Sequence, residues 1–377
     1  MRKLLFIDRD GTIIVEPPSD YQVDKIEKLD FLPNVITCLS AICRELDYEL
    51  VMVTNQDGLG TDSFSEEAFQ APHDLMLRVL RSENIQWREI IIDPSWPKDQ
   101  SPNRKPNTGR VKHYLLGDFD LDNSFVIGDR MTDMIFARNM GAQGIMIGKS
   151  DDDTEDHLAD GSNLDDTISL RTNNWPDVYQ FLKNLPRKIS IKRVTNETEV
   201  QIDLNLEGSG RTDISTGLSF FDHMLDQLGK HGGIDLVLKV HGDLDIDEHH
   251  TIEDTGLALG EAFLKALGTK RGMERYGFAL PMDDCQATVT LDFGGRPWLV
   301  WSANFTREKI GDVPTEMFHH FFKSFSDTAK CNLNIAVEGE NEHHKIESIF
   351  KAFARAMRRA IKRDMEQFDL PTTKGVI

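Results

Sequence analysis

The chain has 377 residues, more than a single hydrophobic core usually organises, so two domains of comparable size are expected. Its composition, 39% hydrophobic and 28% charged, is ordinary for a globular protein. The formal net charge of -20 disfavours nucleic acid and anionic membranes as partners, because both would repel the chain.

The N-terminus and the cysteines bear on where the protein works. The chain begins MRKLLFIDRDG, with few apolar residues before an acidic cluster, and nowhere is an apolar run long enough to span a bilayer. We therefore expect no export and no membrane role. The four cysteines, Cys38, Cys43, Cys285 and Cys331, form no CxxC pair, which argues against a disulfide framework and a thiolate zinc site. The sequence thus predicts a cytoplasmic protein.

From Lys3 to about Gly148, short apolar runs alternate with amphipathic segments of helical length. The runs are KLLFID, ELVMVTN, EIIID, SFVIGD and GIMIG. This alternation predicts an α/β fold, in which a parallel sheet is covered by helices on both faces. The polar residues that follow the runs would then lie together at the carboxyl ends of the strands, where such sheets place their functional residues.

A change of composition marks the end of this region. The segment KSDDDTEDHLADGSNLDD is acidic and nearly without apolar residues, which predicts a solvated loop rather than a metal site. NNWPDVYQFLKNL then predicts a helix that closes the first domain, and RKISIKRVTNETEVQIDLNLEG opens a strand-rich region. We therefore expect the boundary near Pro186, with domains at 1–185 and 186–377.

The first candidate site begins with two carboxylates at the end of the first apolar run. In FIDRDGT, Asp8 and Asp10 are two residues apart, so along a strand they point to one side and can share a substrate. One carboxylate can attack phosphorus and form an acyl phosphate, while the other handles protons. A phosphatase of this kind needs positive charge nearby, because nucleophile and phosphate repel each other.

Later strand ends supply suitable partners. VTNQ ends the next strand with Thr54 and Asn55, whose hydroxyl and amide groups suit phosphoryl oxygens, and RKP offers Lys105. VIGDRMTD ends another strand with Asp129, followed by Asp133. The carboxylates of Asp8, Asp10 and Asp129 would form an oxygen-rich site appropriate for Mg2+.

The order DxDGT, then Thr after an apolar strand, then Lys, then GDxxxD resembles the haloacid dehalogenase superfamily. The resemblance covers essentially the whole first domain and implies a Rossmann-like three-layer α/β/α fold. It implies that Asp8 is the nucleophile and a metal ligand and that Asp10 is the general acid/base. By the same resemblance, Thr54 and Lys105 bind phosphate and Asp129 binds the metal.

More narrowly, TNQDGLGT and the residues around NRKP resemble the histidinol-phosphate and heptose-bisphosphate phosphatases. Members of these families carry a CxH...CxC zinc loop before the RKP lysine. The corresponding stretch here reads DPSWPKDQSPNRKP, which puts oxygen groups at those positions: Asp93, Ser95, Ser101 and Asn103. Oxygen groups are poor ligands for a tetrahedral zinc site, so we expect no zinc in this domain and an altered loop over the active site.

The second region is rich in histidine and contains an internal echo. Nine of the twelve histidines follow residue 220, and FFDHML with a later HHTIED is echoed by MFHHFF with a later HHKIES. The echo predicts a duplicated unit of strands and helices. On a helix, His249 and Glu253 would lie on one face, whereas His249 and His250 diverge by about 100°. Two copies of HHxxE predict a dinuclear site for Mn2+, Fe2+ or Zn2+, with His223 and His320 as further ligands.

These stretches, with GDLDIDEHHTIEDTGLALGEA, KRGMERYG, GRPW and the terminal TTKGVI, closely resemble imidazoleglycerol-phosphate dehydratase. The resemblance runs from about Ile189 to the C-terminus. It implies a duplicated α/β sandwich, a large homo-oligomer, and two manganese ions held at sites completed between subunits. It implies the metal ligands His223, His249, His250, Glu253, His320, His343, His344 and Glu347, with Glu347 also catalytic. It assigns the substrate phosphate to Arg271, Arg296, Thr372, Thr373 and Lys374, while Glu197, Asp283 and Lys351 are weaker candidates.

Together the two resemblances predict a bifunctional enzyme of histidine biosynthesis. Dehydration must remove a proton from carbon without a neighbouring carbonyl, so the substrate imidazole would serve as electron sink, aided by metal at its nitrogens. For the first domain two alternatives stay open: hydrolysis of another small phosphate ester, or a non-catalytic assembly role.

Overall fold

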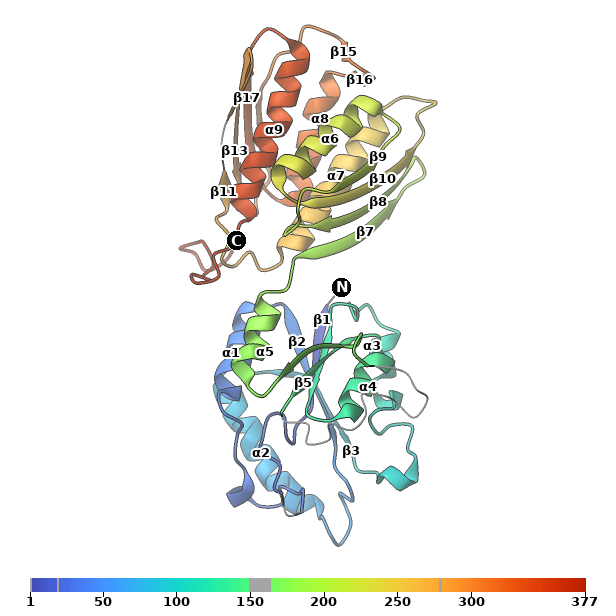
Figure 1. Cartoon of the computed structure of the whole chain (residues 1–377), viewed down its shortest axis with the longest axis vertical. Coiled ribbons are helices and arrows are strands. Elements are labelled where there is room, and N and C mark those ends of the chain that lie inside the picture. Colours follow the sequence, from blue (N-terminus) through green and yellow to red (C-terminus); the bar gives the residue numbers. More distant parts are fainter. Residues whose placement is uncertain (1, 19, 149–163, 278–279) are drawn as a thin grey trace. The chain divides into compact units, whose positions relative to one another are not determined.

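The computed structural model describes residues 2–18, 20–148, 164–277 and 280–377. Almost all of the acidic segment from Lys149 onward lies outside these ranges, so its interpretation as a loop stays a prediction. The chain divides into two compact units, Met1–Leu185 and Pro186–Ile377 (Figure 1). Within the described ranges, no helix is both long and apolar enough to cross a membrane.

The first unit is built on a six-stranded sheet whose paired strands are all parallel. In spatial order the strands are β3 (Trp87–Asp93), β2 (Tyr48–Asn55), β1 (Lys3–Ile7), β4 (Phe125–Gly128), β5 (Gln143–Ile147) and β6 (Ile168–Thr172). The helices are α1 (Val35–Glu45), α2 (Glu66–Ser82), α3 (Lys112–Leu115), α4 (Met131–Met140) and α5 (Trp175–Lys183), with short 3-10 turns at Ile26–Lys28, Pro97–Asp99 and Gly109–Val111. The five strands expected from the apolar runs are present, and β6 is an addition.

Strand β1 shows why helices cover both faces of this sheet. Leu5 and Ile7 pack into a core with α1, α2 and α5, whereas Leu4 and Phe6, which alternate with them, pack into a second core with α3 and α4. A strand that is apolar on both sides can be buried only between two layers. The α/β prediction for this half is therefore confirmed.

Helix α2 carries a buried histidine that couples stability to pH. His73 is 3% exposed and stacks on Phe69 with ring centroids 4.8 Å apart, and the guanidinium of Arg9 lies 4.9 Å from the same phenyl ring. Burial, and secondarily the charge of Arg9, lowers the pKa of His73 to about 4. The native state therefore holds this imidazole neutral.

We expect the free energy of unfolding of the first unit to fall as the pH is lowered from about 6.5 toward 4. In this range His73 binds a proton in the unfolded chain but stays neutral in the native chain. A His73→Phe variant keeps an aromatic ring but removes this proton. Between pH 7 and pH 5, the free energy of unfolding of the wild type should fall by about 2 kcal/mol more than that of the variant. Unfolding in urea is monitored through the loss of phosphatase activity. Parallel pH profiles for the two proteins would refute the assignment.

The second unit has two sheets with helices between them (Figure 1). One sheet has the order β7 (Lys188–Val194), β8 (Thr198–Asn205), β10 (Asp235–Gly242), β9 (Thr212–Ser215). The other has the order β11 (Tyr276–Gly277), β13 (Cys285–Asp292), β17 (Asn332–Glu338), β14 (Trp298–Ser302), with β12 (Leu280–Met282) also on β13, and a small hairpin pairs β15 (Lys309–Ile310) with β16 (Val313–Pro314). The helices are α6 (Ser219–Gly232), α7 (His249–Leu267), α8 (Glu316–Ala329) and α9 (Glu342–Ile361).

The two halves of this unit repeat one plan. In the first half β10 pairs antiparallel with β8 and parallel with β9, and in the second half β17 pairs antiparallel with β13 and parallel with β14. Helices α6 and α7 flank β10 in the chain as α8 and α9 flank β17. One continuous core joins residues of both sheets with all four helices. The predicted duplicated α/β sandwich is confirmed.

Candidate active sites

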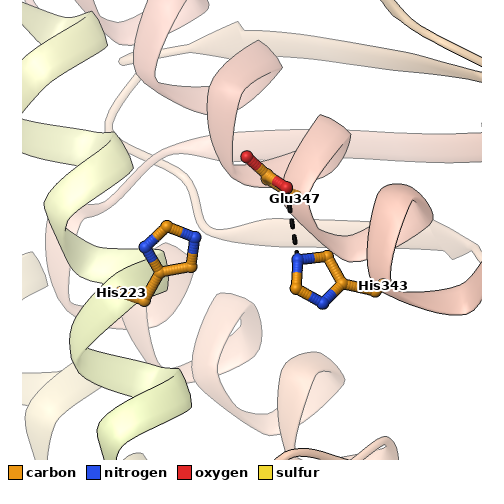
Figure 2. A group of neighbouring side chains, drawn as sticks. All are labelled: His223, His343 and Glu347. Carbon is orange, nitrogen blue, oxygen red and sulfur yellow. Dashed lines mark ion pairs between the residues drawn. The ribbon is translucent and has the colours of Figure 1, made fainter.

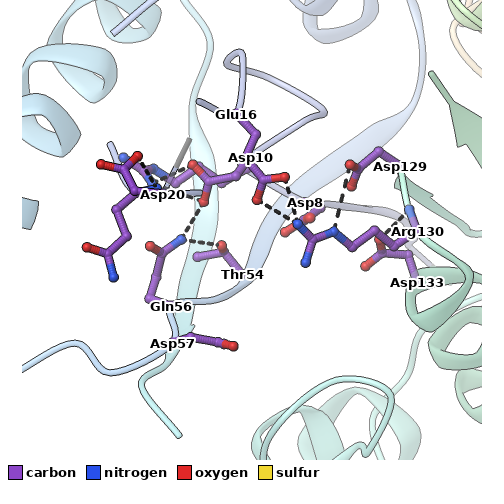
Figure 3. Close-up of polar contacts among 12 residues, drawn as sticks. Asp8, Asp10, Glu16, Asp20, Thr54, Gln56, Asp57, Asp129, Arg130 and Asp133 are labelled. Carbon is purple, nitrogen blue, oxygen red and sulfur yellow. Dashed lines mark hydrogen bonds and ion pairs between the residues drawn. The ribbon is translucent and has the colours of Figure 1, made fainter. Parts of the chain in front are cut away.

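Functional side chains of the first unit gather at the carboxyl edge of its sheet (Figure 3). Asp8 and Asp10 follow β1, Thr54 lies at the end of β2, and Asp129 follows β4. These strands are neighbours in the sheet, so their ends meet. Residues far apart in sequence thereby form one polar site.

Three carboxylates form the centre of this site. Asp8, Asp129 and Asp133 can each direct an oxygen into a group whose atoms all lie within 4.8 Å of one another. The ammonium of Lys105, buried from solvent, lies 2.7 Å from Asp8 Oδ1 and 2.7 Å from Asp133 Oδ1. Burial opposes the charge of Lys105, but the two carboxylates raise its pKa above the ordinary value.

The centre carries more negative charge than Lys105 neutralises. Burial, together with Asp8 and Asp133, raises the pKa of Asp129 to about 8. Among the described residues, the buried Oδ1 of Asp129 has no hydrogen-bond partner. A hard divalent cation fits this arrangement, because it prefers oxygen ligands and would relieve the repulsion.

The side chain of Asp10 lies in a different group. Its carboxylate accepts hydrogen bonds from Arg9 Nη1, at 2.8 and 3.1 Å, and from Gln56 Nε2 at 2.5 Å. Burial, and to a lesser extent Asp8, raises the pKa of Asp10 even though Arg9 opposes the rise. A carboxyl group with a raised pKa suits proton transfer. Asp133 stands in the carboxylate cluster where the sequence suggested Asp10.

Thr54 and Asn55 differ in their surroundings. Thr54 Oγ1 accepts a hydrogen bond of 2.8 Å from Gln56 and lies beside the Asp10 group. Asn55 instead hydrogen-bonds the backbone of Lys105, accepting from its N–H at 3.1 Å and donating to its carbonyl at 3.2 Å. Asn55 therefore holds the lysine in place, whereas the sequence suggested it for phosphate.

The loop that lacks thiolates is held by hydrogen bonds. Asp93 Oδ1 accepts from the backbone N–H of Ser95 at 3.0 Å and from its hydroxyl. Arg104 donates to the carbonyl of Ser95 at 2.6 Å and pairs with Asp57. Farther along the loop, the N–H of Asn103 donates to Ser101 Oγ at 3.2 Å. The residues that replace the thiolates and the imidazole of the zinc loop are thus joined in two pairs by hydrogen bonds, Asp93 with Ser95 and Ser101 with Asn103.

In the second unit each HHxxE motif begins a helix, and its first histidine faces its glutamate. His249 Nε2 lies 2.9 Å from Glu253, and His343 Nε2 lies 3.3 Å from Glu347. The turn that starts α9 is capped by Asn341, whose side chain accepts hydrogen bonds from the backbone of both following histidines. The predicted (i, i+4) face is therefore present in both copies.

A histidine from another helix completes each group. His320 of α8 joins His249 and Glu253, with its ring centroid 4.9 Å from that of His249. His223 of α6 joins His343 and Glu347 (Figure 2). In both groups the possible ligand atoms lie within 4.8 Å of one another, and their nitrogen and carboxylate donors fit Mn2+, Fe2+ or Zn2+.

The second histidine of each motif points elsewhere. The ring planes of His249 and His250 differ by 71°, and those of His343 and His344 by 89°. His250 contacts Asp243, and His344 contacts Asp284. These carboxylates raise the pKa of both imidazoles. Neither histidine belongs to the group formed by its neighbour.

Glu347 has a basic neighbour of its own. Lys351 Nζ lies 2.8 Å from Glu347 Oε1, one helical turn further along α9. Burial opposes the ionisation of Glu347, but Lys351 keeps the pKa of the carboxyl below its ordinary value. Glu197 lies 3.8 Å from His250 Nε2. Lys351 and Glu197 thus lie beside residues of the two HHxxE motifs.

The residues expected to hold phosphate lie at the other end of the helices. The backbone of Arg275 bonds to Ala360 at the end of α9, its guanidinium donates to the carbonyl of Pro371, and Gly272 donates to Asp369 in the C-terminal tail. The turn 271–275 and the tail with Lys374 are thereby joined, and Gly295, next to Arg296, lies beside Ile377. At 1.5 Å per residue, roughly 25 Å of helix separates His343 from this end. Arg275, which the sequence interpretation missed, makes the contact to the tail.

Comparisons with known proteins cover both units. The family model of imidazoleglycerol-phosphate dehydratase matches residues 216–357, and a model described as HAD-hydrolase-like matches residues 102–168. The "Histidine biosynthesis bifunctional protein HisB" of Bacteroides fragilis is 57% identical over 377 residues, which is 100% of both chains.

Two solved structures resemble one half each. Imidazoleglycerol-phosphate dehydratase from Staphylococcus aureus has 33% identity and a TM-score of 0.43, covering 47% of this chain and 99% of its own. D,D-heptose 1,7-bisphosphate phosphatase from B. bronchiseptica has 25% identity and a TM-score of 0.38, covering 48% of this chain and 99% of its own. The full-length relative therefore provides the stronger comparison.

Proposed function

The chain belongs to the bifunctional histidine biosynthesis proteins, and from this membership we infer that Met1–Leu185 is its phosphatase and Pro186–Ile377 its dehydratase. The protein is accordingly a hydrolase and a lyase in one chain. The dehydratase converts imidazoleglycerol phosphate to imidazoleacetol phosphate, and the phosphatase releases phosphate from histidinol phosphate. The observation that carries the assignment is that each unit has candidate metal-binding groups of its own, one group of three carboxylates in the first and two groups of histidine and glutamate in the second.

For the phosphatase, Asp8 is the nucleophile. Its carboxylate attacks phosphorus while Asp10 protonates the leaving alcohol oxygen, and the resulting aspartyl phosphate is hydrolysed by a water from which Asp10 takes a proton. Thr54 and Lys105 bind the phosphoryl oxygens, and Asn55 supports Lys105. Asp8, Asp129 and Asp133 would hold Mg2+, which supplies the positive charge that lets two anions approach.

For the dehydratase, the histidine and glutamate groups would hold two Mn2+ ions per site. The metals would withdraw electron density from the substrate imidazole and so lower the cost of removing a proton from carbon. Glu347, kept ionised by Lys351, is the group that we assign to proton transfer. The predicted ligands are His223, His249, His250, Glu253, His320, His343, His344 and Glu347.

A complete dehydratase site needs more than one chain. The histidine groups and the phosphate set Arg271, Arg296, Thr372, Thr373 and Lys374 belong to opposite ends of α9, farther apart than one small substrate can reach. His250 and His344 also point away from the groups of their own chain. These observations support assembly into a homo-oligomer in which one copy binds the phosphate and another supplies the metal ligands.

The state of the cysteines bears on the cellular location. All four cysteines are described, and all are free. Free thiols persist where glutathione and thioredoxin keep them reduced. We therefore assign the enzyme to the cytoplasm, with small phosphate esters as its substrates and no nucleic-acid or membrane partner.

Removal of divalent metal tests both assignments in one sample. Treatment of the purified protein with EDTA should abolish dehydration of imidazoleglycerol phosphate and phosphate release from histidinol phosphate. Mn2+ should restore the first activity and Mg2+ the second, with metal analysis recording which ions the untreated protein contains. Dehydration that survives complete removal of metal would contradict the proposal for the second unit.

The altered loop favours one alternative for the first unit. The polar loop around Ser95 and Arg104 could select another small phosphate ester, since such loops shape the entrance to the site. Comparing kcat/KM for histidinol phosphate with that for sugar phosphates distinguishes the two functions. A non-catalytic assembly role for this unit is opposed by the intact group of Asp8, Lys105 and Asp129.

A further inference from the structure

The second histidine of each HHxxE motif contacts an aspartate through the same ring nitrogen. His250 Nδ1 lies 3.0 and 3.2 Å from the two oxygens of Asp243, and His344 Nδ1 contacts Asp284 Oδ1. By contrast, the first histidine of each motif uses Nε2 toward its glutamate. The Nε2 atoms of the second histidines thus lie on the side of the ring away from the aspartates.

The two aspartates are not copies of each other in the repeat. Asp243 directly follows β10, whereas Asp284 directly precedes β13, the strand that corresponds to β8. A contact that merely accompanied the duplication would use equivalent positions. Here the two halves form the same contact from different strand ends, which indicates that the contact to Nδ1 is functional rather than a by-product of the duplication.

We propose that Asp243 and Asp284 are positioning residues that fix the ring orientation and tautomer of His250 and His344 as metal ligands. In a neutral imidazole, a proton on Nδ1 that is donated to a carboxylate leaves the lone pair on Nε2, which is then the coordinating atom. Carboxylates in this outer position orient metal-binding imidazoles and strengthen their basicity. The inference rests on the proposed dehydratase site and adds the residues that prepare it.

The surroundings of the aspartates fit this role. The backbone of Asp243 is held at both ends, since its N–H donates to the carbonyl of Glu197 and its carbonyl accepts from Ile246. Asp284 Oδ2 accepts from the N–H groups of Glu340 at 3.1 Å and Asn341 at 2.9 Å, which leaves Oδ1 for His344. The backbone of Asp243 and one carboxylate oxygen of Asp284 are therefore held by contacts that do not involve the histidines.

Asp243 gives the cleaner test, because its described side-chain contact is with His250, whereas Asp284 also supports the start of α9. Metal-free full-length Asp243→Ala should bind Mn2+ about 10- to 100-fold more weakly in isothermal titration calorimetry. Asp243→Asn should lose less, since an amide oxygen still accepts the Nδ1 proton but carries no charge. The exposed Asp245→Asn in the same loop should bind Mn2+ like wild type.

A double variant separates this inference from the proposed site. If Asp243 acts through His250, then adding Asp243→Ala to His250→Ala should weaken Mn2+ binding no further. Loss of affinity in His250→Ala but not in Asp243→Ala would overturn the positioning role alone. Unchanged affinity in His250→Ala would overturn the proposed ligand set itself. Equal melting temperatures for Asp243→Ala and wild type would exclude a merely structural effect, and a fall in melting temperature that accounts for the lost affinity would overturn the inference.

Discussion

Replacing Asp8 by asparagine should reduce phosphate release from histidinol phosphate by at least about a thousandfold, because it removes the carboxylate that we propose attacks phosphorus. The reaction should be followed by release of inorganic phosphate at saturating Mg2+. The dehydratase activity of the same chain should be unchanged, and it serves as the internal control that the variant protein is folded and active. The exposed Asp118→Asn is a matched control and should keep both activities.

The same variant should not lower the melting temperature of the phosphatase unit. Asp8, Asp129 and Asp133 repel one another, and burial together with this repulsion raises the pKa of Asp129 to about 8. Removing one charge relieves this strain, although Lys105 loses one partner. Loss of phosphatase activity with unchanged stability would identify a chemical role. Residual activity near the wild-type rate would mean that another group attacks phosphorus.

The parts of the fold that could be predicted from the sequence are governed by local patterns. Apolar runs such as KLLFID predicted β1 because a strand buried on both faces has no other composition, and the spacing of His249 and Glu253 fixes their common helical face. Strand β6 (Ile168–Thr172) was missed although its residues alternate between apolar and polar, because it is only five residues long and follows directly on the acidic segment. The order of the strands is a property of the whole chain and could not be read locally.

The site could be predicted in its residue types but not in its contacts. Arg9 is the chain neighbour of Asp10, but Gln56 reaches Asp10 only after β1 and β2 pair, so no spacing in the sequence indicates that contact. Asp133 was visible in the GDRMTD motif, but its place in the carboxylate cluster depends on the start of α4. The tail that carries Lys374 is joined to Arg275, and this contact spans almost a hundred residues.

The second large effect that we expect is the loss of dehydration in variants at either end of α9. Glu347→Gln should reduce dehydration by about a thousandfold, because it removes a group assigned both to metal binding and to proton transfer, and Lys374→Ala should weaken the reaction by raising KM for the phosphate-bearing substrate. Each variant disables a different end of the helix, while the phosphatase unit stays active in both. Activity of the second unit is measured as formation of imidazoleacetol phosphate.

Mixing the two variants distinguishes a shared site from a site within one chain. If both chains are dissociated, combined in equal amounts and reassembled, roughly a quarter of the sites would pair an intact histidine group from one chain with an intact tail from another. Dehydration should therefore recover in the mixture but not in either variant reassembled alone. A mixture no more active than its components would show that each chain completes its own site. The roughly 25 Å between His343 and the end of α9 would then have to close within one subunit, which a straight helix of 20 residues does not allow.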